Sequence, residues 1–550
     1  MKFIISDNIK LPNSFGKWNY WHDSDVKVHE GKDTITLYHG YAIDENRTMD
    51  DYVQEGELPK DLNGNFSIVK LSKKSVVATV DHFSQNRIYY WNNDKGFSLT
   101  NRLYLFPFQH KDVILSKITR YQDISKEKEP HYTWYDFEKV FKSRGGYEQQ
   151  PLPKDVNERN FVHYSMDTST CWKDTHSLLA GAILHYDDEL HIKKNTNHDS
   201  LIKDAFNSKD KKFKTPEQLR DHVHYCMESH AKIINANYKT VVCSVSEGID
   251  SQTYDAYFPN ARKITHTIQG YGDEQFCGAG IETSADPRYK QEYLSKYPKG
   301  MVREDPFSVE DAGNIAEKWL NDTELKHWDC LPTYHQIMEN DRDMDIFIFG
   351  QQADEMFMHN AVFYLTYVKG ILRDSGIPVE QQFEKYKEYV EQLRGKYSAK
   401  EVLFGENFWE YREDYKIDSL ENFKRADADF ENWQDWFSYE CMPTYYNREI
   451  SHVCDKPVTS LYADTRMFYD VRNSTHDIML ANMSDAMTQK QILMDKFNHE
   501  FKTPYKNGTY FNTTPMVNSF AEKTLGYCLQ DHLAEINKDQ LTETTWGRIK

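Results

Sequence analysis

The stretch VVCSVSEGIDSQ, at positions 241–252, decides the fold class. An apolar run, VVCSV, gives way to small polar residues, a glycine and an aspartate in the pattern Ser-x-Gly-x-Asp-Ser. The apolar part predicts a buried strand, and the part after it predicts a tight turn that leads into a helix. Such a turn can wrap an anion, because its backbone N–H groups and the helix N-terminus form a concave site for negative charge.

The segments around this stretch alternate between helices and strands. Thr215-Pro216-Glu217-Gln218 supplies a capping residue, a proline at the first helical position and a glutamine at the third, so it predicts a helix that ends between 235 and 238. Shorter patterns predict a helix at 252–258, strands at 263–268 and 345–349, and a helix that begins at Ser308. Strands separated by helices indicate a doubly wound parallel sheet, and from about residue 353 onward we expect helices and no further strand.

The first third of the chain has a different character. Short β-rich runs (TITLYHG, NFSIVKL, SVVATVDHF and RIYYW) alternate with turn signals such as Asn63-Gly64, which is the pattern of an antiparallel sheet. Residues from about 105 to 200 show no clean period, and no element is predicted there. We therefore expect two domains, an antiparallel-sheet domain at 1–200 and a parallel-sheet domain with a helical C-terminal part at 201–550.

The composition limits the kinds of partner. With 86 acidic and 67 basic residues, the net charge of -19 repels nucleic acid and anionic membranes unless a local basic patch overrides it. No apolar stretch is long enough to span a bilayer, and the N-terminal apolar segment is too short for a signal peptide. The 8 cysteines include no C-x-x-C pair, so they are expected to be reduced thiols. We expect a cytoplasmic protein that binds neither nucleic acid nor membrane, with a homodimer as one option for its oligomeric state.

The turn after the first parallel strand is the first candidate binding site, because ligands of such sheets bind beyond the carboxyl ends of the strands. Gly248 lets the main chain approach a ligand closely, and Ser246 and Ser251 can donate hydroxyl hydrogen bonds. Asp250 would repel phosphates unless it binds a magnesium ion. A simple strand-to-helix turn, in which Ser246 or Asp250 only caps the helix, would give the same pattern.

Two later segments carry chemistry of the same kind. The run DIFIFGQQADEMF brings Gly350 and then Asp354 and Glu355 to the same edge of the sheet, where Asp354 can supply a second carboxylate to the metal. The helix dipole is an alternative reason for such an acidic pair at a helix start. Lys490 and Lys506 follow late in the chain. A lysine is usually a solvated side chain, so it is their order after the other motifs that makes these two candidates.

This order of motifs resembles the synthetase domain of glutamine-dependent asparagine synthetase and of its relatives, β-lactam synthetase and the lasso-peptide cyclases. The loop 246–251 is similar to the S-G-G-x-D-S pyrophosphate loop of ATP pyrophosphatases, and 349–357 resembles the family's S-G-E-G-A-D-E-L-F. LYADTRMF (461–468) is similar to P-F-L-D-x-R through Asp464 and Arg466. In the first third, Leu62-Asn63-Gly64-Asn65-Phe66 and Asp81 followed by Tyr89-Tyr90 resemble the class II glutaminase pattern.

The resemblance implies fold class α/β and α+β: an Ntn-like antiparallel-sheet domain followed by a doubly wound ATP-pyrophosphatase domain of the adenine nucleotide alpha hydrolase type. It implies a ligase that uses ATP to adenylate a small-molecule or peptide carboxylate and then transfers it to an amine or ammonia. ATP and Mg²⁺ would be its cofactors, with Asp250 and Asp354 as metal ligands. The implied nucleotide-binding residues are Ser246, Glu247, Gly248, Ile249, Asp250, Ser251 and Gly350. The implied catalytic residues are Lys506, Lys490, Gln351 and Glu355.

The sequence also departs from the family. Lys2 stands where the family glutaminase has its cysteine, and His39-Gly40 where it has Asn-Gly, so we expect no release of ammonia from glutamine. Glu247 replaces a glycine of the loop, and a carboxylate ~4 Å from a phosphate charge would cost about 4 kcal/mol at an effective dielectric of about 20. Gln351-Gln352 stand where the family has Glu-Gly. Three functions stay open: an amide-forming ligase, an asparagine synthetase fed by ammonia, and a catalytically inactive binding or scaffold protein.

Overall fold

The structure is a computed structural model of the chain. It describes residues 1–56, 62–106, 175–178, 180–194, 205, 208–245, 248–269, 275–277, 283–284, 297–299, 301–308, 341–350, 352–357, 451, 455–475, 478–479, 481–482 and 486–499. For 194, 266–269, 275–277, 283–284 and 304–308 and for Asp354 and Glu355 the description is limited to the backbone.

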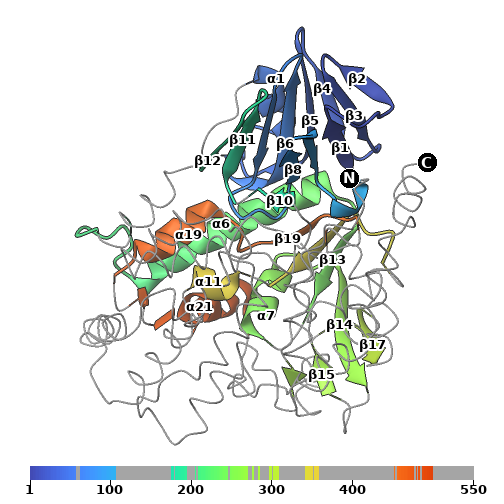
Figure 1. The fold of residues 1–550 in the computed structure, drawn as a ribbon. Helices are drawn as coiled ribbons and strands as arrows, with labels where there is room; N and C mark the ends of the chain where they lie inside the picture. Colours follow the sequence, from blue (N-terminus) through green and yellow to red (C-terminus); the bar gives the residue numbers. More distant parts are fainter. Residues whose placement is uncertain are drawn as a thin grey trace, which may run out of the picture.

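Two six-stranded antiparallel sheets form the N-terminal part, which we call the sandwich (Figure 1). The first has the order β10 (Thr175–Ser177), β8 (Tyr89–Asn93), β9 (Gly96–Thr100), β1 (Phe3–Ser6), β3 (Trp18–His22) and β2 (Asn13–Phe15). The second has the order β12 (Leu190–Lys194), β11 (Ala182–Tyr186), β7 (Val76–Val80), β6 (Gly64–Ser72), β5 (Thr34–Ala42) and β4 (Lys27–Glu30). The four β-rich runs of the sequence form β5, β6, β7 and β8, so the expected antiparallel sheet is confirmed.

The inner faces of the two sheets enclose one apolar core. Its strands alternate in burial because successive side chains point to opposite faces, as in β7. At one end of this core the ring of Phe97 stacks on Tyr186 at 4.1 Å between centroids, and Trp18 meets both rings edge-on. The short helix α1 (Met49–Glu55), capped by Thr48, packs on the outer face of the second sheet, and a 3-10 turn η1 (Leu103–Leu105) follows β9.

A seven-stranded, mainly parallel sheet forms the second part of the molecule. Its parallel strands lie in the order β17 (Val302–Ser308), β14 (Arg262–Gln269), β13 (Val241–Ser244), β18 (Ile346–Phe349) and β19 (Val458–Ser460). β15 (Gln275–Cys277) pairs antiparallel with β14, and β16 (Thr283–Ser284) pairs with β15. Numbered along the chain, the parallel strands have the order 3-2-1-4-5, so the direction of winding reverses between β13 and β18. The molecule is therefore mixed α/β, with the parallel sheet that the sequence predicted.

The described helices of this part are α6 (Pro216–Asn237), α7 (Ile249–Ala256), α11 (Ala353–Met356), α19 (Thr465–Arg472) and α21 (Met487–Phe497). The start of α6 is the predicted one. The Thr215 side chain accepts from the Gln218 backbone N–H, and the Gln218 side chain accepts in return from the backbone of Thr215. The predicted strands and the helix at 252–258 are confirmed by β13, β14, β18 and α7, with boundaries shifted by a few residues for α7.

Four strands contradict or extend the sequence predictions. β19 lies beyond residue 353, where no strand was expected; it is three residues long, too short for any period to show. Ser308, the predicted cap of a helix, is the last residue of β17, whose charges and Pro306 hid the strand pattern, and the predicted helix lies outside the described residues. The hairpin of β11 and β12 lies in the segment where no element was predicted.

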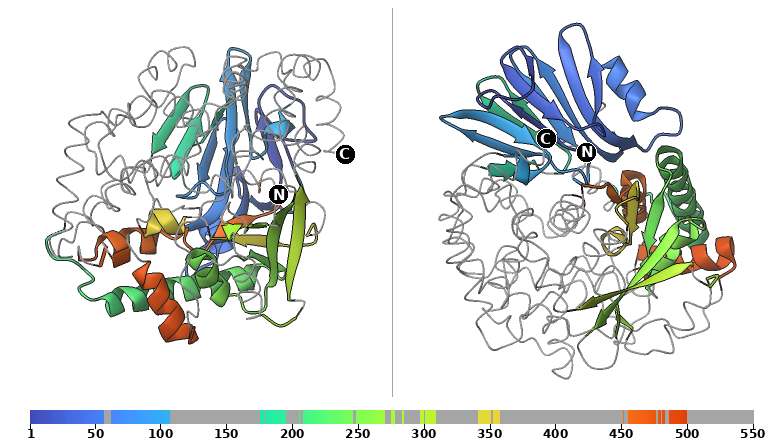
Figure 2. Two further views of the ribbon diagram at one scale, coloured as in Figure 1. Left: turned by 90° about the horizontal axis from the view of Figure 1, so that it is seen from below. Right: turned by 90° about the vertical axis from the view of Figure 1, so that its right-hand side faces the viewer.

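The sandwich is joined to the second part through buried polar contacts. Figures 1 and 2 show α6 running beneath the sandwich. The hydroxyl of Tyr41, on β5, lies 2.8 Å from Nε2 of His230 on α6 and 3.0 Å from Oγ1 of Thr459 on β19. Thr459 in turn donates to Gln85 of the sandwich at 2.9 Å. His230 Nδ1 is 3.3 Å from the carbonyl oxygen of Leu461, which fits a neutral imidazole that donates there and accepts from Tyr41.

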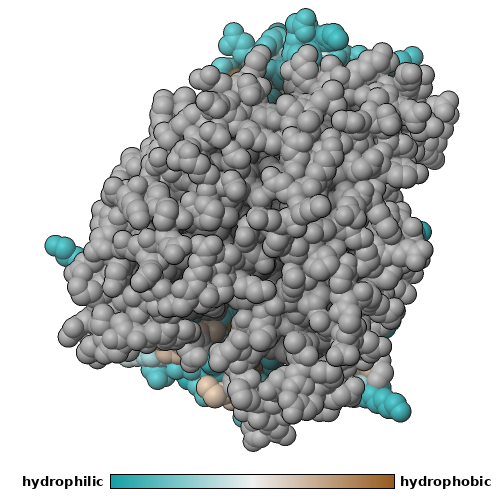
Figure 3. All heavy atoms as spheres, turned by 60° about the horizontal axis from the view of Figure 1, so that its bottom comes forward, coloured by the Kyte–Doolittle hydropathy of each residue, from teal (hydrophilic) through white to brown (hydrophobic). Residues whose placement is uncertain are grey.

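No helix among the described residues is long and apolar enough to cross a membrane. On the face drawn in Figure 3, the described residues that reach the surface are mostly hydrophilic.

The buried His230 predicts a loss of stability in acid. Burial lowers its pKa to about 4, so the folded protein keeps the imidazole neutral, whereas the unfolded chain takes up a proton near the ordinary pKa of 6.5. The native state thus binds fewer protons, and we expect about 3 kcal/mol of stability to be lost as the pH falls from 6.5 towards 4. The measurement is the free energy of urea unfolding against pH for the wild type and His230→Gln, which retains a polar partner for Tyr41. Equal losses in both proteins over this window would contradict the prediction.

Candidate functional site

The carboxyl ends of β13 and β18 meet where the winding of the parallel sheet reverses. The two strands pair in register, and beyond their ends stand Gly350 and the start of α7, whose second residue is Asp250. A Cβ on Gly350 would lie 3.3 Å from Cβ of Asp250 and 3.0 Å from Cε1 of Tyr254. Any side chain at position 350 would therefore press on α7, and glycine is what allows this close approach.

Side chains from two other segments bond Asp250, one through its carboxylate and one through its backbone oxygen. Gln489, on α21, donates from Nε2 to Oδ1 of Asp250 at 2.6 Å. The same nitrogen lies 3.2 Å from the hydroxyl of Tyr462, just after β19, and this hydroxyl donates to the backbone oxygen of Asp250 at 2.9 Å. Elements from four parts of the chain, α7, β18, β19 and α21, therefore meet at Asp250. Sequence reasoning did not single out Gln489, which directly precedes Lys490, or Tyr462, which lies within the run 461–468, because the resemblance in that run was carried by Asp464 and Arg466.

The cap of α7 is Gly248, which has no side chain to bond the first turn. Asp250 is therefore not the capping residue, and it lies in the first turn, where the helix dipole favours negative charge. This excludes Asp250 from the alternative in which the motif only caps a helix. Ser246, the other candidate cap, lies outside the described residues.

The described candidates lie on three neighbouring elements. Gly248, Ile249, Asp250 and Ser251 belong to the start of α7, Gly350 follows β18, and Lys490 follows Gln489 on α21, which packs against α7. Ile249 is buried against Leu493 of α21, so its side chain serves packing. Asp354 and Glu355 lie in the short helix α11 directly after this strand tip, and only their backbone is described. Ser246, Glu247, Gln351 and Lys506 lie outside the described residues, so their places in the site remain predictions.

The described side chains fit a magnesium ion whose other ligands are phosphate oxygens. Mg²⁺ usually takes one or two carboxylates and fills its other positions with phosphate oxygens and water. Asp250 supplies one carboxylate beside a strand tip that has no side chain, and no group of three or more His, Cys, Asp or Glu side chains within the described ranges forms a closed metal cage. Cys226 and Cys243 are buried free thiols, as expected.

Asp464 and Arg466, which carry part of the family resemblance, form a structural link. Asp464 caps α19, is fully buried and accepts from Arg466 at 2.6 Å. Burial works to raise the pKa of Asp464, but Arg466 outweighs it and the pKa is lowered, so this carboxyl is charged. Asn63 of the sandwich donates to Asp464 at 2.8 Å and accepts from the Thr465 N–H at 3.2 Å, and Arg466 also reaches Ser229 of α6 at 3.0 Å. The pair therefore joins the sandwich to α6 and α19.

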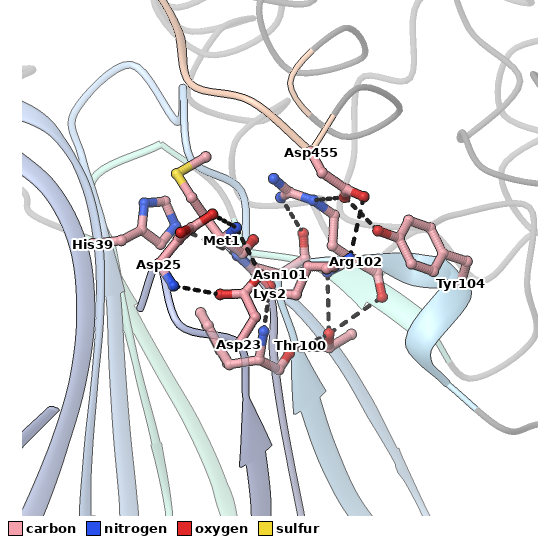
Figure 4. Close-up of polar contacts among 11 residues, drawn as sticks. Met1, Lys2, Asp23, Asp25, His39, Thr100, Asn101, Arg102, Tyr104 and Asp455 are labelled. Atoms are coloured by element: carbon pink, nitrogen blue, oxygen red, sulfur yellow. Dashed lines mark hydrogen bonds and ion pairs between the residues drawn. The ribbon is translucent and has the colours of Figure 1, made fainter. Parts of the chain in front are cut away.

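Lys2, at the position where the resembling family has its cysteine, also makes a link to the second part (Figure 4). Nζ of Lys2 lies 3.5 Å from Asp455, which also accepts from Arg102 at 3.1 Å and from the hydroxyl of Tyr104. The Lys2 ammonium is thus engaged by a carboxylate from the segment before β19. Nearby, the buried Nε2 of His39 is 3.4 Å from the amide of Asn101.

A scan against protein-family models found no family whose model matches the chain, and a search of curated proteins found no relative that matches. The functional assignment therefore depends on the geometry of the site.

Gln352, between the glycine and α11, adopts a left-handed backbone with a φ of 75°. The resembling family has glycine at this position, and glycine is the residue that takes this conformation without strain. A side chain in this region costs roughly 1–2 kcal/mol. The side-chain oxygen of Gln352 is also buried without a hydrogen-bond partner among the described residues.

We expect Gln352→Gly to raise the free energy of unfolding by about 1 kcal/mol, because it removes both the backbone strain and the unpaired oxygen. Gln352→Ala is the matched control, since it removes the amide and keeps the strain. Thermal unfolding of the three proteins checks this order. If the glycine variant is no more stable than the alanine variant, the backbone at position 352 is not strained.

Proposed function

We propose that the chain is an ATP-dependent ligase of the asparagine synthetase type, which adenylates a carboxylate and joins it to an amine or ammonia, with release of AMP and pyrophosphate. The close approach of Gly350 to Asp250 at the reversal of winding carries this proposal. In open parallel sheets this crevice beyond the strand ends is the place where nucleotides bind.

The elements around the crevice suit a triphosphate. The N-terminus of α7 offers backbone N–H groups and a favourable dipole to phosphate oxygens, with Gly248 as the residue of closest approach. Asp250 and Asp354 would hold magnesium, which when bound neutralises charge on the phosphate oxygens. Lys490 and Lys506 would stabilise negative charge on the leaving pyrophosphate, an interaction whose loss typically costs about 3–4 kcal/mol. Gln351 and Glu355 remain candidates for the amine-transfer half of the reaction.

Gln489 and Tyr462 act as positioning residues in this proposal. They bond the carboxylate and the backbone of Asp250, and so they fix the direction in which the remaining coordination sites point. Outer partners of a metal ligand are typically worth 10–100-fold in activity or metal affinity. We therefore infer that Gln489→Leu lowers the activity by roughly this factor.

We further infer the domain division at 1–200 and 201–550, with an Ntn-like first domain that releases no ammonia from glutamine. The two antiparallel layers of the sandwich support the first point, and the ion pair of Lys2 with Asp455 at the former nucleophile position supports the second. A non-catalytic binding protein is the second candidate. It is favoured by the amide of Gln489, which already occupies one oxygen of Asp250.

Carboxylate-dependent release of pyrophosphate from ATP and Mg²⁺ tests the ligase. We expect release with at least one member of a panel of amino acids and small carboxylic acids. In Asp250→Asn the rate of release should fall by a factor on the order of 10² or more, because the metal loses a charged ligand. The matched control is Asp221→Asn, which changes an exposed acid on α6 and should leave the rate unchanged.

Asparagine formed from aspartate and ammonium would identify the ammonia-fed synthetase. Binding of ATP without turnover for any carboxylate would support the binding protein and overturn the ligase.

A further inference from the structure

The hairpin of β11 and β12 carries metal-binding residue types at alternate positions. The run HYDDELH, residues 185–191, places His185, Asp187, Glu189 and His191 two residues apart. His185 lies on β11 and His191 on β12, and Asp187 and Glu189 lie in the turn between them. Successive residues of a strand face opposite sides. Tyr186 belongs to the core of the sandwich, so the histidine before it projects from the outer face.

The two histidines stand directly opposite each other. His185 pairs with His191 in the antiparallel register, and their rings stack with centroids 6.3 Å apart at an angle of 21°. Their side chains are 40% and 54% exposed, so an ion in solvent can reach both rings and both rings can turn. Directly opposed side chains have Cβ atoms about 4.5–5.5 Å apart, a separation that two imidazoles can close around one ion.

Each imidazole has a carboxylate beside the same ring nitrogen. Nε2 of His185 is 4.0 Å from Asp187, and Nε2 of His191 is 3.8 Å from Glu189. The third acid of the turn, Asp188, forms an ion pair with Lys17 at 2.5 Å. Lys17 is therefore directed to Asp188 and not to Asp187 or Glu189. The charges of Asp187 and Glu189 therefore favour a cation at the imidazole nitrogens.

We propose that His185 and His191 chelate a divalent transition-metal ion of the Zn²⁺, Ni²⁺ or Cu²⁺ type, with Asp187 and Glu189 as flanking ligands. Imidazole nitrogens suit these ions, whereas Mg²⁺ and Ca²⁺ prefer oxygen. With zinc–nitrogen bonds of about 2.0–2.1 Å, both nitrogens bind after a rotation of the exposed rings. Since the described residues contain no ready-made group of three such ligands, the chelate assembles around the ion, with water in any position that a carboxylate leaves open.

Such an ion would fasten the edge of the second sheet. β12 is the last strand of that sheet and is paired only through β11 within the described residues. An ion held across the two strands stabilises the hairpin by mass action, because it binds the folded pair, with the histidines already opposed, more tightly than the unfolded pair. The site lies in the sandwich and does not depend on the proposed ligase activity.

Calorimetric titration of the full chain with ZnCl₂ tests the proposal, with His185→Ala and His191→Ala compared with the wild type. His29→Ala is the matched control, since His29 lies on β4 at the opposite edge of the same sheet and pairs with Thr36. We expect either single change to remove one zinc equivalent or to weaken its binding by roughly 10²-fold, because the ion loses one of its two imidazole ligands. His29→Ala should bind zinc as the wild type does. Zinc should raise the thermal midpoint of the wild type and of His29→Ala, but not that of His185→Ala or His191→Ala.

Thermal unfolding without metal checks that the variants fold. We expect them to be as stable as the wild type, because both histidine side chains are exposed. Three results would overturn the proposal: no zinc bound by the wild type, unchanged binding in His185→Ala, or a loss in only one of the two variants. Magnesium at the same concentration should not compete, and competition by magnesium would contradict the imidazole chelate.

Discussion

The approach of two strand ends at Gly350 is the constraint on which the candidate site depends. The order of the parallel strands brings the ends of β13 and β18 together, and the absence of a side chain at position 350 lets α7 sit against them. Asp250 then meets Gln489 and Tyr462, which come from segments more than two hundred residues later. A carboxylate fixed in this way is preorganised, because the free energy of orienting it has been supplied by folding.

The same logic holds for the contact between the sandwich and the parallel sheet. Tyr41 with His230, and Asn63 with Asp464, are buried polar pairs. Buried polar groups are costly unless their partners are in place, so these contacts define one arrangement of the two parts. β19 has a central place in this arrangement, because it completes the parallel sheet, offers Thr459 to Tyr41 and leads directly to Tyr462 and Asp464.

Local patterns predicted the local structure well, and tertiary contacts were beyond them. The cap at Thr215 and the apolar runs ending at Ser244 and Phe349 were readable because each is set by neighbouring residues. β19 was missed because three residues carry no period, and its strand conformation is imposed by pairing with β18. Asp464 and Arg466 were singled out for the family resemblance, and their contacts assign them to a structural link between the two parts. No sequence pattern could assign Gln489 to Asp250 across 239 positions.

The most direct measurement is a crystal structure of the protein with Mg²⁺ and a non-hydrolysable ATP analogue. We expect phosphates at the N-terminus of α7, between the ends of β13 and β18, with the metal ion bound by Asp250. A nucleotide seated elsewhere, or this crevice filled by side chains at saturating nucleotide, would contradict it.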